Sequence, residues 1–347
     1  MDATLADGVV RAGTQARERY YDSRGYGRPV DAGKLELAPV EAAHLLYRGD
    51  LGGVDGMALR EFLASSVVSE VDFFVYKDLR DRGFYCSPAT PERVDDPDGC
   101  DFVVYPRGKG PWDDAVAYRI RVVSERETVA ADGLGDCALA VVDEESEVSY
   151  FETRRPDVTG TSQSAVSTTE GDLLADRVVC WEPPAELYEQ AFYGQPMDEQ
   201  DADAVQLSLV EAAYLAETGS LRVDGGPEAV IERGRSVEGE RFDRRLSVYE
   251  ALRDGGVAPK TGFKFGADFR TYAAVESVDD LGHSELLVRV FDAGHVFEPR
   301  DLALDVRLAH GVRKTMAYAF VGTDGGESSE GEDGTDIEWL AVERLTP

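Results

Sequence analysis

The residues with the clearest chemical potential are a tyrosine, a histidine and a lysine in strand-like, otherwise apolar segments: Tyr272, His283 and Lys314. Histidine titrates near neutral pH and can protonate a leaving oxygen. A lysine ammonium can neutralise charge on a pentacovalent phosphate, and a tyrosine beside it can take a proton from an attacking 2′-hydroxyl. These residue types therefore suit cleavage of a ribose phosphodiester without a metal ion.

The elements that must position these three side chains can be read from the apolar pattern. Tyr272 lies in an alternating, strand-like segment, and His283 heads an apolar segment, 283–290, that also indicates a strand. Lys314 follows a predicted helix and precedes a further strand. The elements expected in this region are strands at 269–275, 285–291, 316–321 and 337–342 and a helix at 301–309. Because residues on adjacent sheet elements can converge, we expect one catalytic site here.

Each residue type also has an ordinary structural role. A tyrosine at a strand end is more often part of a core, and a lysine after a helix is commonly a solvated cap. Two other histidines, His44 and His295, fit ordinary helix and loop positions, and His310 is a weaker acid–base candidate. The chain has no G-x-x-x-x-G-K-[ST], no G-x-G-x-x-G before a helix and no H-E-x-x-H motif. Since no carboxylate cluster stands out from the acidic background, we expect neither a metal nor a cofactor.

The chain contains two copies of one pattern in the same order. The corresponding segments are 7–11 and 176–180, 26–29 and 193–196, 35–44 and 205–214, 75–80 and 248–253, and 101–105 and 268–272. In the first copy Tyr105 aligns with Tyr272, whereas Ala115 aligns with His283 and Gly135 with Lys314. The first copy thus lacks two of the three candidate groups, which predicts one working site per chain.

We therefore predict an α+β fold built from two tandem homologous repeats. A non-catalytic repeat is expected at 1–155, a polar linker at 156–173 and a catalytic repeat at 174–347, with an acidic loop insertion at 322–336. Each repeat would begin with a small subdomain of helices and strands and end with a mixed, nuclease-like sheet. Predicted helices are 41–46, 58–81, 211–215 and 241–254; predicted strands outside the catalytic region are 9–10, 102–105, 118–123, 138–142 and 178–179.

The charge balance indicates the environment of the protein. The chain has 68 acidic and 36 basic residues among 347, a formal charge of −32. A hydrophobic content of 43% with 15 Tyr and 14 Phe argues against a disordered acidic chain. We predict a folded protein from a cytoplasm at molar salt, where surface carboxylates maintain solubility and salt screens their repulsion.

The cysteines and the apolar runs exclude other classes of protein. The four cysteines, Cys86, Cys100, Cys137 and Cys180, form no C-x-x-C pair and are expected to be reduced thiols. No apolar run follows Met1, and no stretch approaches eighteen apolar residues. We therefore expect neither secretion nor a membrane span.

Three blocks of the second copy resemble the catalytic segments of archaeal tRNA-splicing endonucleases in order and spacing: 260–272, 283–288 and 305–316. The two-copy layout is similar to the long-chain homodimeric form of that family. The resemblance implies excision of introns from precursor tRNA at a bulge–helix–bulge structure. It also implies 2′,3′-cyclic phosphate and 5′-hydroxyl ends, formed without a metal ion.

The resemblance further implies roles for individual residues. Tyr272 would be the general base, His283 the general acid and Lys314 the group that stabilises transition-state charge. The two family arginines that sandwich a flipped bulge base fall on Arg307 and Arg344. An acidic loop that docks into the partner chain falls on 132–136, with Asp132 and Asp136 at its ends. The implied partners are precursor tRNA and a second copy of this chain.

Two other readings stay open at this point. One is a non-catalytic RNA-binding or assembly subunit that keeps the scaffold, as the first copy does. The other is a nuclease of related fold that cuts DNA, which usually needs carboxylate–metal chemistry. The complete Tyr–His–Lys set in the second copy favours the RNA-cleaving enzyme.

Overall fold

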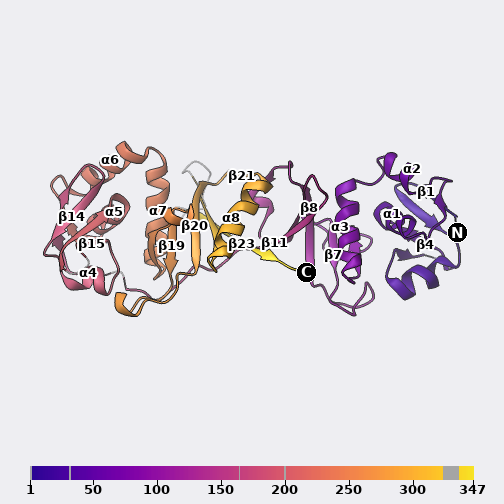
Figure 1. Ribbon diagram of the computed structural model, residues 1–347, viewed down its shortest axis with the longest axis horizontal. Helices are drawn as coiled ribbons and strands as arrows, with labels where there is room; N and C mark the ends of the chain where they lie inside the picture. The colour runs from indigo at the N-terminus through magenta and orange to yellow at the C-terminus, as the bar shows by residue number, and fades with distance from the viewer. Residues whose placement is uncertain (1, 31–32, 164, 199–200, 323–335) are drawn as a thin grey trace, which may run out of the picture. The chain divides into compact units, whose positions relative to one another are not determined.

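The computed structural model describes residues 2–30, 33–163, 165–198, 201–322 and 336–347. The chain forms two compact units of mixed α+β structure, as predicted (Figure 1). The first unit comprises Met1–Arg154 with Phe297–Ala303 and Glu343–Pro347; the second comprises Arg155–Val296 and Leu304–Val342. The predicted acidic loop 322–336 lies, apart from its two end residues, outside the described residues.

The first unit begins with a small sheet in the order β3-β4-β2-β1-β5. Its strands are β1 (Asp2–Ala6), β2 (Val9–Ala12), β3 (Arg28–Pro29), β4 (Leu35–Leu37) and β5 (Gly53–Val54), with helical elements η1 (Arg17–Asp22), α1 (Pro39–Tyr47), α2 (Leu59–Ala64) and α3 (Glu70–Asp81). Helix α1 is buried on almost every side, and its buried residues include the polar Glu41 and His44 beside Val40, two alanines and two leucines.

A second sheet completes the first unit, in the order β6-β7-β8-β10-β11. It contains β6 (Cys86–Pro88), β7 (Phe102–Val104), β8 (Tyr118–Ser124), β10 (Ala138–Val142) and β11 (Val148–Arg154); the short elements β9 (Val129–Ala130) and η3 (Ala131–Gly133) precede β10. Helix α3 covers one face of this sheet (Figure 1) and buries Phe73, Val75, Tyr76 and Leu79 in a core shared with α1.

The second unit repeats this order. Its N-terminal part contains β12 (Thr169–Glu170), β13 (Asp172–Leu173), β14 (Arg177–Trp181), α4 (Ala185–Glu189), β15 (Gln195–Asp198), β16 (Asp201–Ser208), α5 (Leu209–Glu217), β17 (Leu221–Arg222), α6 (Gly226–Glu238) and α7 (Arg241–Asp254). Ser208 caps α5: its hydroxyl accepts the backbone N–H of Glu211 at 3.3 Å, while the Glu211 carboxylate accepts the backbone N–H of Ser208 at 3.0 Å.

The sheet of the second unit runs in the order β18-β19-β20-β22-β23. Its elements are β18 (Ala258–Thr261), η4 (Phe263–Phe265), β19 (Phe269–Tyr272), η5 (Val278–Asp280), β20 (Leu286–Asp292), β21 (Val296–Phe297), α8 (Pro299–Gly311), β22 (Thr315–Val321) and β23 (Ile337–Leu345). Helix α7 packs on one face of it (Figure 1). The helix contributes Phe242, Leu246, Tyr249 and Leu252 to the core.

Two helix predictions need correction. The single helix predicted over 58–81 is wrong, because α2 ends at Ala64 and α3 begins at Glu70. Ser66 between them has a left-handed φ of 57°, and the Ser65 hydroxyl donates to the Phe62 carbonyl at 2.6 Å, which satisfies the end of α2. Helix α6 was missed because its charged surface residues leave few buried positions.

The segment predicted as a linker is hydrogen-bonded to the second unit. Its backbone N–H groups donate from Gly160 to Gly255, from Ser162 to Gly256 and from Thr161 to Ala273, at 2.7–2.8 Å. Gly160 fits so closely that an added Cβ would lie 2.3 Å from the Ala273 carbonyl oxygen. Residues 160–162 therefore support the end of β19.

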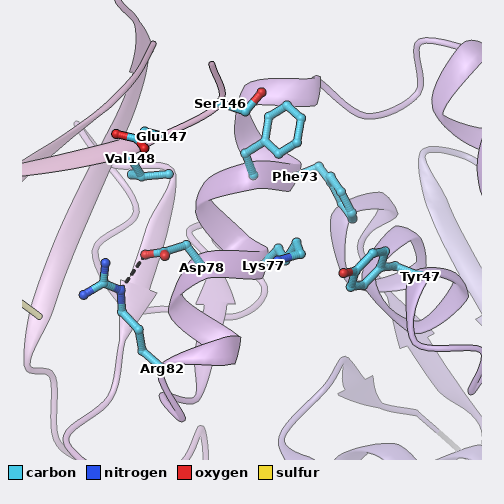
Figure 2. A pocket seen from close by; sticks show the side chains of 9 residues that line it. Tyr47, Phe73, Lys77, Asp78, Arg82, Ser146, Glu147 and Val148 are labelled. Carbon is cyan, nitrogen blue, oxygen red and sulfur yellow. Dashed lines mark hydrogen bonds and ion pairs between the residues drawn. The ribbon is translucent and has the colours of Figure 1, made fainter. Parts of the chain in front are cut away.

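A surface pocket of the first unit lies between α1, α3 and the start of β11 (Figure 2). Tyr47 and Phe73 line its apolar side, and the Lys77 ammonium lies 5.3 Å from the Tyr47 ring centroid. On the other side Arg82 is paired with Asp78 at 2.6 Å. Both cations of this pocket thus have partners, and none of the predicted site residues lines it.

No helix in the described ranges is long and apolar enough to cross a membrane.

Candidate active site

Neighbouring strands of the second unit bring Tyr272 and Lys314 to the same edge of the sheet. Strand β19 runs antiparallel to β20 with Arg270 opposite Leu287, and β20 runs parallel to β22 with Leu286 opposite Thr315. Tyr272 ends β19 and Lys314 immediately precedes β22. Both therefore stand where β20 begins.

Glu285 joins the two ends at this edge. Its backbone N–H donates to the Thr271 carbonyl and its own carbonyl accepts from Thr315, both at 3.1 Å. Its carboxylate oxygen Oε2 accepts the backbone N–H of Ala273 at 3.1 Å. Glu285 thus connects Thr271 and Ala273, which flank Tyr272, to Thr315, which follows Lys314.

The side chains of Tyr272 and Lys314 project from the same face of the sheet. Phe269 and Ala317 point to the core under α7, where the Phe269 ring lies 5.9 Å from the Tyr249 ring. Because side chains alternate along a strand, Arg270 and Tyr272 point to the opposite face, and Lys314 shares that parity. The sheet therefore presents a phenol and two cations together.

His283 lies in an exposed loop, and the prediction that it heads a strand is wrong, because β20 begins only at Leu286. The loop leaves the ladder at Ser284, whose carbonyl accepts from the Lys314 ammonium at 2.7 Å instead of from a neighbouring strand. The same ammonium also donates to the Ser284 hydroxyl. Lys314 therefore fixes the residue next to His283, which brings that loop to the edge that carries Tyr272.

The surroundings of Lys314 lower its pKa. Burial lowers the pKa of Lys314, the Arg270 guanidinium lowers it further, and Glu285 opposes both. The Phe265 ring centroid lies 6.0 Å from its nitrogen. An anion bound at this edge would raise the pKa of Lys314 again.

A small apolar cluster supports Tyr272, which is 7% exposed. The cluster contains Phe192, Ala258 and Val275. The Phe192 ring meets the Tyr272 ring edge to face at 5.5 Å. The Ser162 hydroxyl donates to the Tyr272 carbonyl at 3.4 Å. Apolar packing thus holds the ring of Tyr272, and Ser162 holds its backbone.

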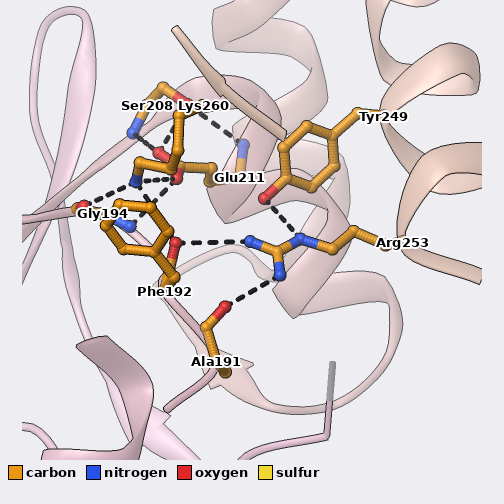
Figure 3. Close-up of polar contacts among 8 residues, drawn as sticks. All are labelled: Ala191, Phe192, Gly194, Ser208, Glu211, Tyr249, Arg253 and Lys260. Carbon is orange, nitrogen blue, oxygen red and sulfur yellow. Dashed lines mark hydrogen bonds and ion pairs between the residues drawn. The ribbon is translucent and has the colours of Figure 1, made fainter. Parts of the chain in front are cut away.

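Buried cations hold Phe192 in turn (Figure 3). Arg253 donates to the Ala191 carbonyl at 2.8 Å and to the Phe192 carbonyl at 3.5 Å, and Lys260 donates to the Phe192 carbonyl at 3.3 Å. Phe192 has a left-handed φ of 56°, and Gly25, one residue before Tyr26 in the first unit, has a φ of 66°. A left-handed backbone is strained in phenylalanine, so the surrounding contacts must hold Phe192 in place.

The most buried ion pair of the second unit joins Lys260 to Glu211 at 3.0 Å (Figure 3). The Glu211 carboxylate also accepts the backbone N–H groups of Gly194 and Ser208, at 2.9 and 3.0 Å. Burial alone would raise the pKa of Glu211, but the Lys260 charge and these N–H groups together lower it to about 2. The pair locks the N-terminal part of the unit onto β18.

The first unit has the same strand register without the same chemistry. Phe102, Ile120 and Ala138 form a row across its sheet, as Phe269, Val288 and Ala317 do in the second unit. Counting from this row puts Ala115 at the position of His283 and Gly135 at that of Lys314, in agreement with the sequence alignment. Tyr105 is present, and its hydroxyl is hydrogen-bonded to Ser87 at 3.1 Å.

The remaining predicted site residues are exposed. Arg307 lies on α8 and Arg344 near the end of β23, in different compact units. Asp132 is in η3, and Asp136 follows it in the same loop before β10. Their predicted roles in RNA and partner binding remain predictions.

Sequence reasoning missed the residues that support the three candidates: Phe192, Arg270, Ser284 and Glu285. A signal existed for Arg270, because residues two apart on a strand share a face. Ser284 and Glu285 adjoin His283 but looked like part of the strand. Phe192 lies 80 residues before Tyr272, so no local pattern could connect them.

Comparison with known proteins identifies relatives over the full chain. The model of the tRNA intron endonuclease catalytic C-terminal domain matches residues 242–330, and the model of the N-terminal domain matches residues 1–63 and 169–232, once in each unit. A protein of Haloarcula marismortui named tRNA-splicing endonuclease is 69% identical, with 100% of both chains covered. Proteins with the same name from Natronomonas pharaonis and Haloferax volcanii are 62% and 52% identical, again over 100% of both chains. The relatives come mostly from halophilic archaea, as the acidic composition predicted.

Proposed function

The chain belongs to the tRNA intron endonuclease family and is an endonuclease, and from this premise we propose that it excises introns from precursor tRNA at a bulge–helix–bulge structure. The observation that carries the proposal is the meeting of Tyr272, Lys314 and the His283 loop at one sheet edge, joined through Ser284 and Glu285.

The proposed reaction is an internal transesterification. Tyr272, acting as the phenolate, takes the proton from the ribose 2′-hydroxyl, and the 2′-oxygen forms a bond to the scissile phosphorus. The bond from phosphorus to the 5′-oxygen breaks, and His283 gives that oxygen a proton. Lys314 stabilises the extra negative charge on the pentacovalent phosphorus. The products are a 2′,3′-cyclic phosphate and a 5′-hydroxyl, and no metal ion takes part.

A single 2′-deoxy nucleotide at the cleavage site should abolish the reaction, because it removes the attacking oxygen. The substrate is a bulge-containing RNA in molar KCl with EDTA, and the measurement is the rate together with the chemistry of the product ends. The all-ribose RNA in the same buffer is the control and should be cut to a cyclic phosphate. Cleavage of the deoxy substrate, or a loss of all activity in EDTA alone, would contradict the mechanism.

The proposed active form is a homodimer in the cytoplasm that presents two sites to the two bulges of one RNA. The first unit, which lacks counterparts of His283 and Lys314, would serve assembly and RNA positioning. Its exposed loop with Asp132 and Asp136 is the proposed contact to the partner chain. Arg344 is proposed as the second arginine that holds a flipped base.

The salt of the cell constrains how RNA is held. For each phosphate contact, the logarithm of the affinity falls by roughly 0.7–0.9 for every tenfold rise in salt concentration. About five contacts therefore lose roughly 4–6 decades of affinity between ~0.15 M and ~3 M salt. Ion pairing therefore contributes little, and recognition of RNA shape and stacking on guanidinium planes should dominate.

Replacement of Arg307 by lysine should therefore impair cleavage nearly as much as replacement by alanine. Lysine keeps the charge but cannot stack as a plane on a base. Arg307→Lys and Arg307→Ala are to be compared in single-turnover cleavage at molar KCl, with Arg300→Lys on the same helix as the matched control. If Arg307→Lys cleaves like wild type in molar salt, stacking by Arg307 is excluded.

A further inference from the structure

Arg270 is a half-buried arginine without a carboxylate partner in the described part of the chain. Among the described residues, no carboxylate lies within ion-pair distance of its guanidinium, and its Nε is buried without a hydrogen bond. This is unexpected in a chain with 68 acidic and 36 basic residues. Removing a charge from water without a counter-charge costs free energy, so the site is unfavourable as it stands.

The neighbours of Arg270 increase that cost. Lys260 lies directly opposite Arg270 in the β18–β19 ladder, and the Arg270 charge lowers the pKa of both Lys260 and Lys314. Glu211 compensates Lys260 at 3.0 Å. At Lys314, Glu285 opposes the effect of Arg270 on the pKa, and the Glu285 carboxylate itself accepts a backbone N–H. The sheet edge therefore carries an excess of positive charge before substrate arrives.

Arg270 lies beside Tyr272, where its charge can act on a bound substrate. The two residues project from the same face of β19, and the Arg270 Cζ lies 5.7 Å from the Tyr272 ring centroid. The matching residue of the first unit is Val103, which is buried and apolar. The unit that lacks the histidine and the lysine thus also lacks this arginine.

We propose that Arg270 is a further catalytic residue, which binds a non-bridging oxygen of the scissile phosphate together with Lys314. The inference rests on the proposed function, since it concerns the same phosphodiester. The pentacovalent phosphorus carries one more negative charge than the substrate, so two cations at this edge stabilise it better than Lys314 alone. A guanidinium can donate two parallel hydrogen bonds to phosphate oxygens. A partly buried contact of this kind is also screened less by molar salt than a surface ion pair.

Arg270→Gln tests the proposal because catalysis and stability should respond differently. Single-turnover cleavage should slow by roughly 10²–10³-fold, the usual loss when one donor to a developing charge is removed. The melting temperature without RNA should stay the same or rise, because an unpaired charge is removed. Arg270→Lys keeps the charge and should retain more activity than Arg270→Gln.

Arg289→Gln on β20 is the matched control. Arg289 points to the same face of the sheet but is paired with Asp305 at 2.5 Å. Its replacement should lower the melting temperature and leave cleavage near the wild-type rate. If Arg270→Gln instead lowers the melting temperature as Arg289→Gln does and cleaves at the wild-type rate, Arg270 is a structural residue and the proposal fails.

Tyr272→Phe separates this inference from the proposed function. If Tyr272→Phe cleaves like wild type, the proposed chemistry itself is wrong. If Tyr272→Phe is inactive while Arg270→Gln cleaves like wild type, the chemistry stands and only the role of Arg270 is lost.

Discussion

Cleavage of a precursor tRNA by the His283→Ala variant should be slower than by wild type by roughly 10²–10⁴-fold, the usual contribution of one proton-transfer group. The loss should arise because the 5′-oxygen leaves without a proton. Binding of the RNA should change little, because His283 lies in an exposed loop and acts only on the leaving group. The measurement is the single-turnover rate at saturating enzyme, together with the dissociation constant of the RNA.

A substrate with sulfur in place of the 5′-bridging oxygen tests the assigned role directly. A thiolate leaves without prior protonation, so this substrate should restore most of the rate to His283→Ala. It should not rescue Tyr272→Phe, in which the attacking 2′-hydroxyl lacks its base. Equal rescue of both variants, or of neither, would contradict the assignment of His283 as the acid.

The Lys260→Met variant should lose about 3–5 kcal/mol of unfolding free energy, the usual cost of leaving one member of a buried ion pair without its partner. Lys260 is 8% exposed and bonds Glu211 at 3.0 Å and the Gly194 carbonyl at 2.6 Å. Denaturant unfolding in molar KCl measures the loss. Adding Glu211→Gln to Lys260→Met should recover part of it, because the uncompensated charge disappears.

The stability that Glu211 contributes through this ion pair falls as the pH is lowered. The pKa of Glu211 is lowered from 4.5 to about 2, so the unfolded state binds protons more readily than the folded state. This contribution to stability is complete above pH 4.5 and is lost as the pH falls toward 2. Lys260→Met should reduce that part of the acid dependence, because the Lys260 charge is the largest of the causes that lower the pKa of Glu211.

Arg93→Met in the first unit is the matched control for Lys260→Met. Arg93 pairs with the buried Glu41 at 2.9 Å, and Glu41 is the counterpart of Glu211 in the aligned copies. Both variants should be destabilised. At temperatures where both remain folded, only Lys260→Met should also slow cleavage, because Lys260 holds the carbonyl of Phe192, which packs on Tyr272. Equal cleavage rates in the two variants would mean that the buried pair does not support the site.

The sequence was sufficient to predict the α+β class, the strands around Tyr272 and the position of Lys314 between a helix and a strand. These features depend on local alternation of apolar residues, which a buried sheet face imposes on the chain. The predicted helix 301–309 is α8, which is longer by two residues at each end. The match of Ala115 and Gly135 to His283 and Lys314 followed from the aligned copies, and the strand registers agree with it.

Other features of the site depend on contacts that no local pattern encodes. The Glu211–Lys260 pair spans 49 positions, and Glu211 is one of 68 acidic residues, so its burial could not be recognised. His283 was assigned to a strand because Ser284 and Glu285 precede an apolar run. The tertiary contact of Ser284 with Lys314 overrides that tendency and leaves the histidine in a loop.

The attachment of residues 160–162 to β19 restricts how this polypeptide could ever be divided between two genes. The backbone of this segment holds Ala273 and Gly256, and Ser162 holds the carbonyl of Tyr272. The second copy begins in the alignment after residue 173. A break there would leave residues 160–162 on the polypeptide that contains the first unit, away from β19. Division into two chains would preserve the catalytic half only if the breakpoint fell close to Arg154, at the end of β11. The C-terminal chain would then include residues 160–162 and keep their contacts with β19.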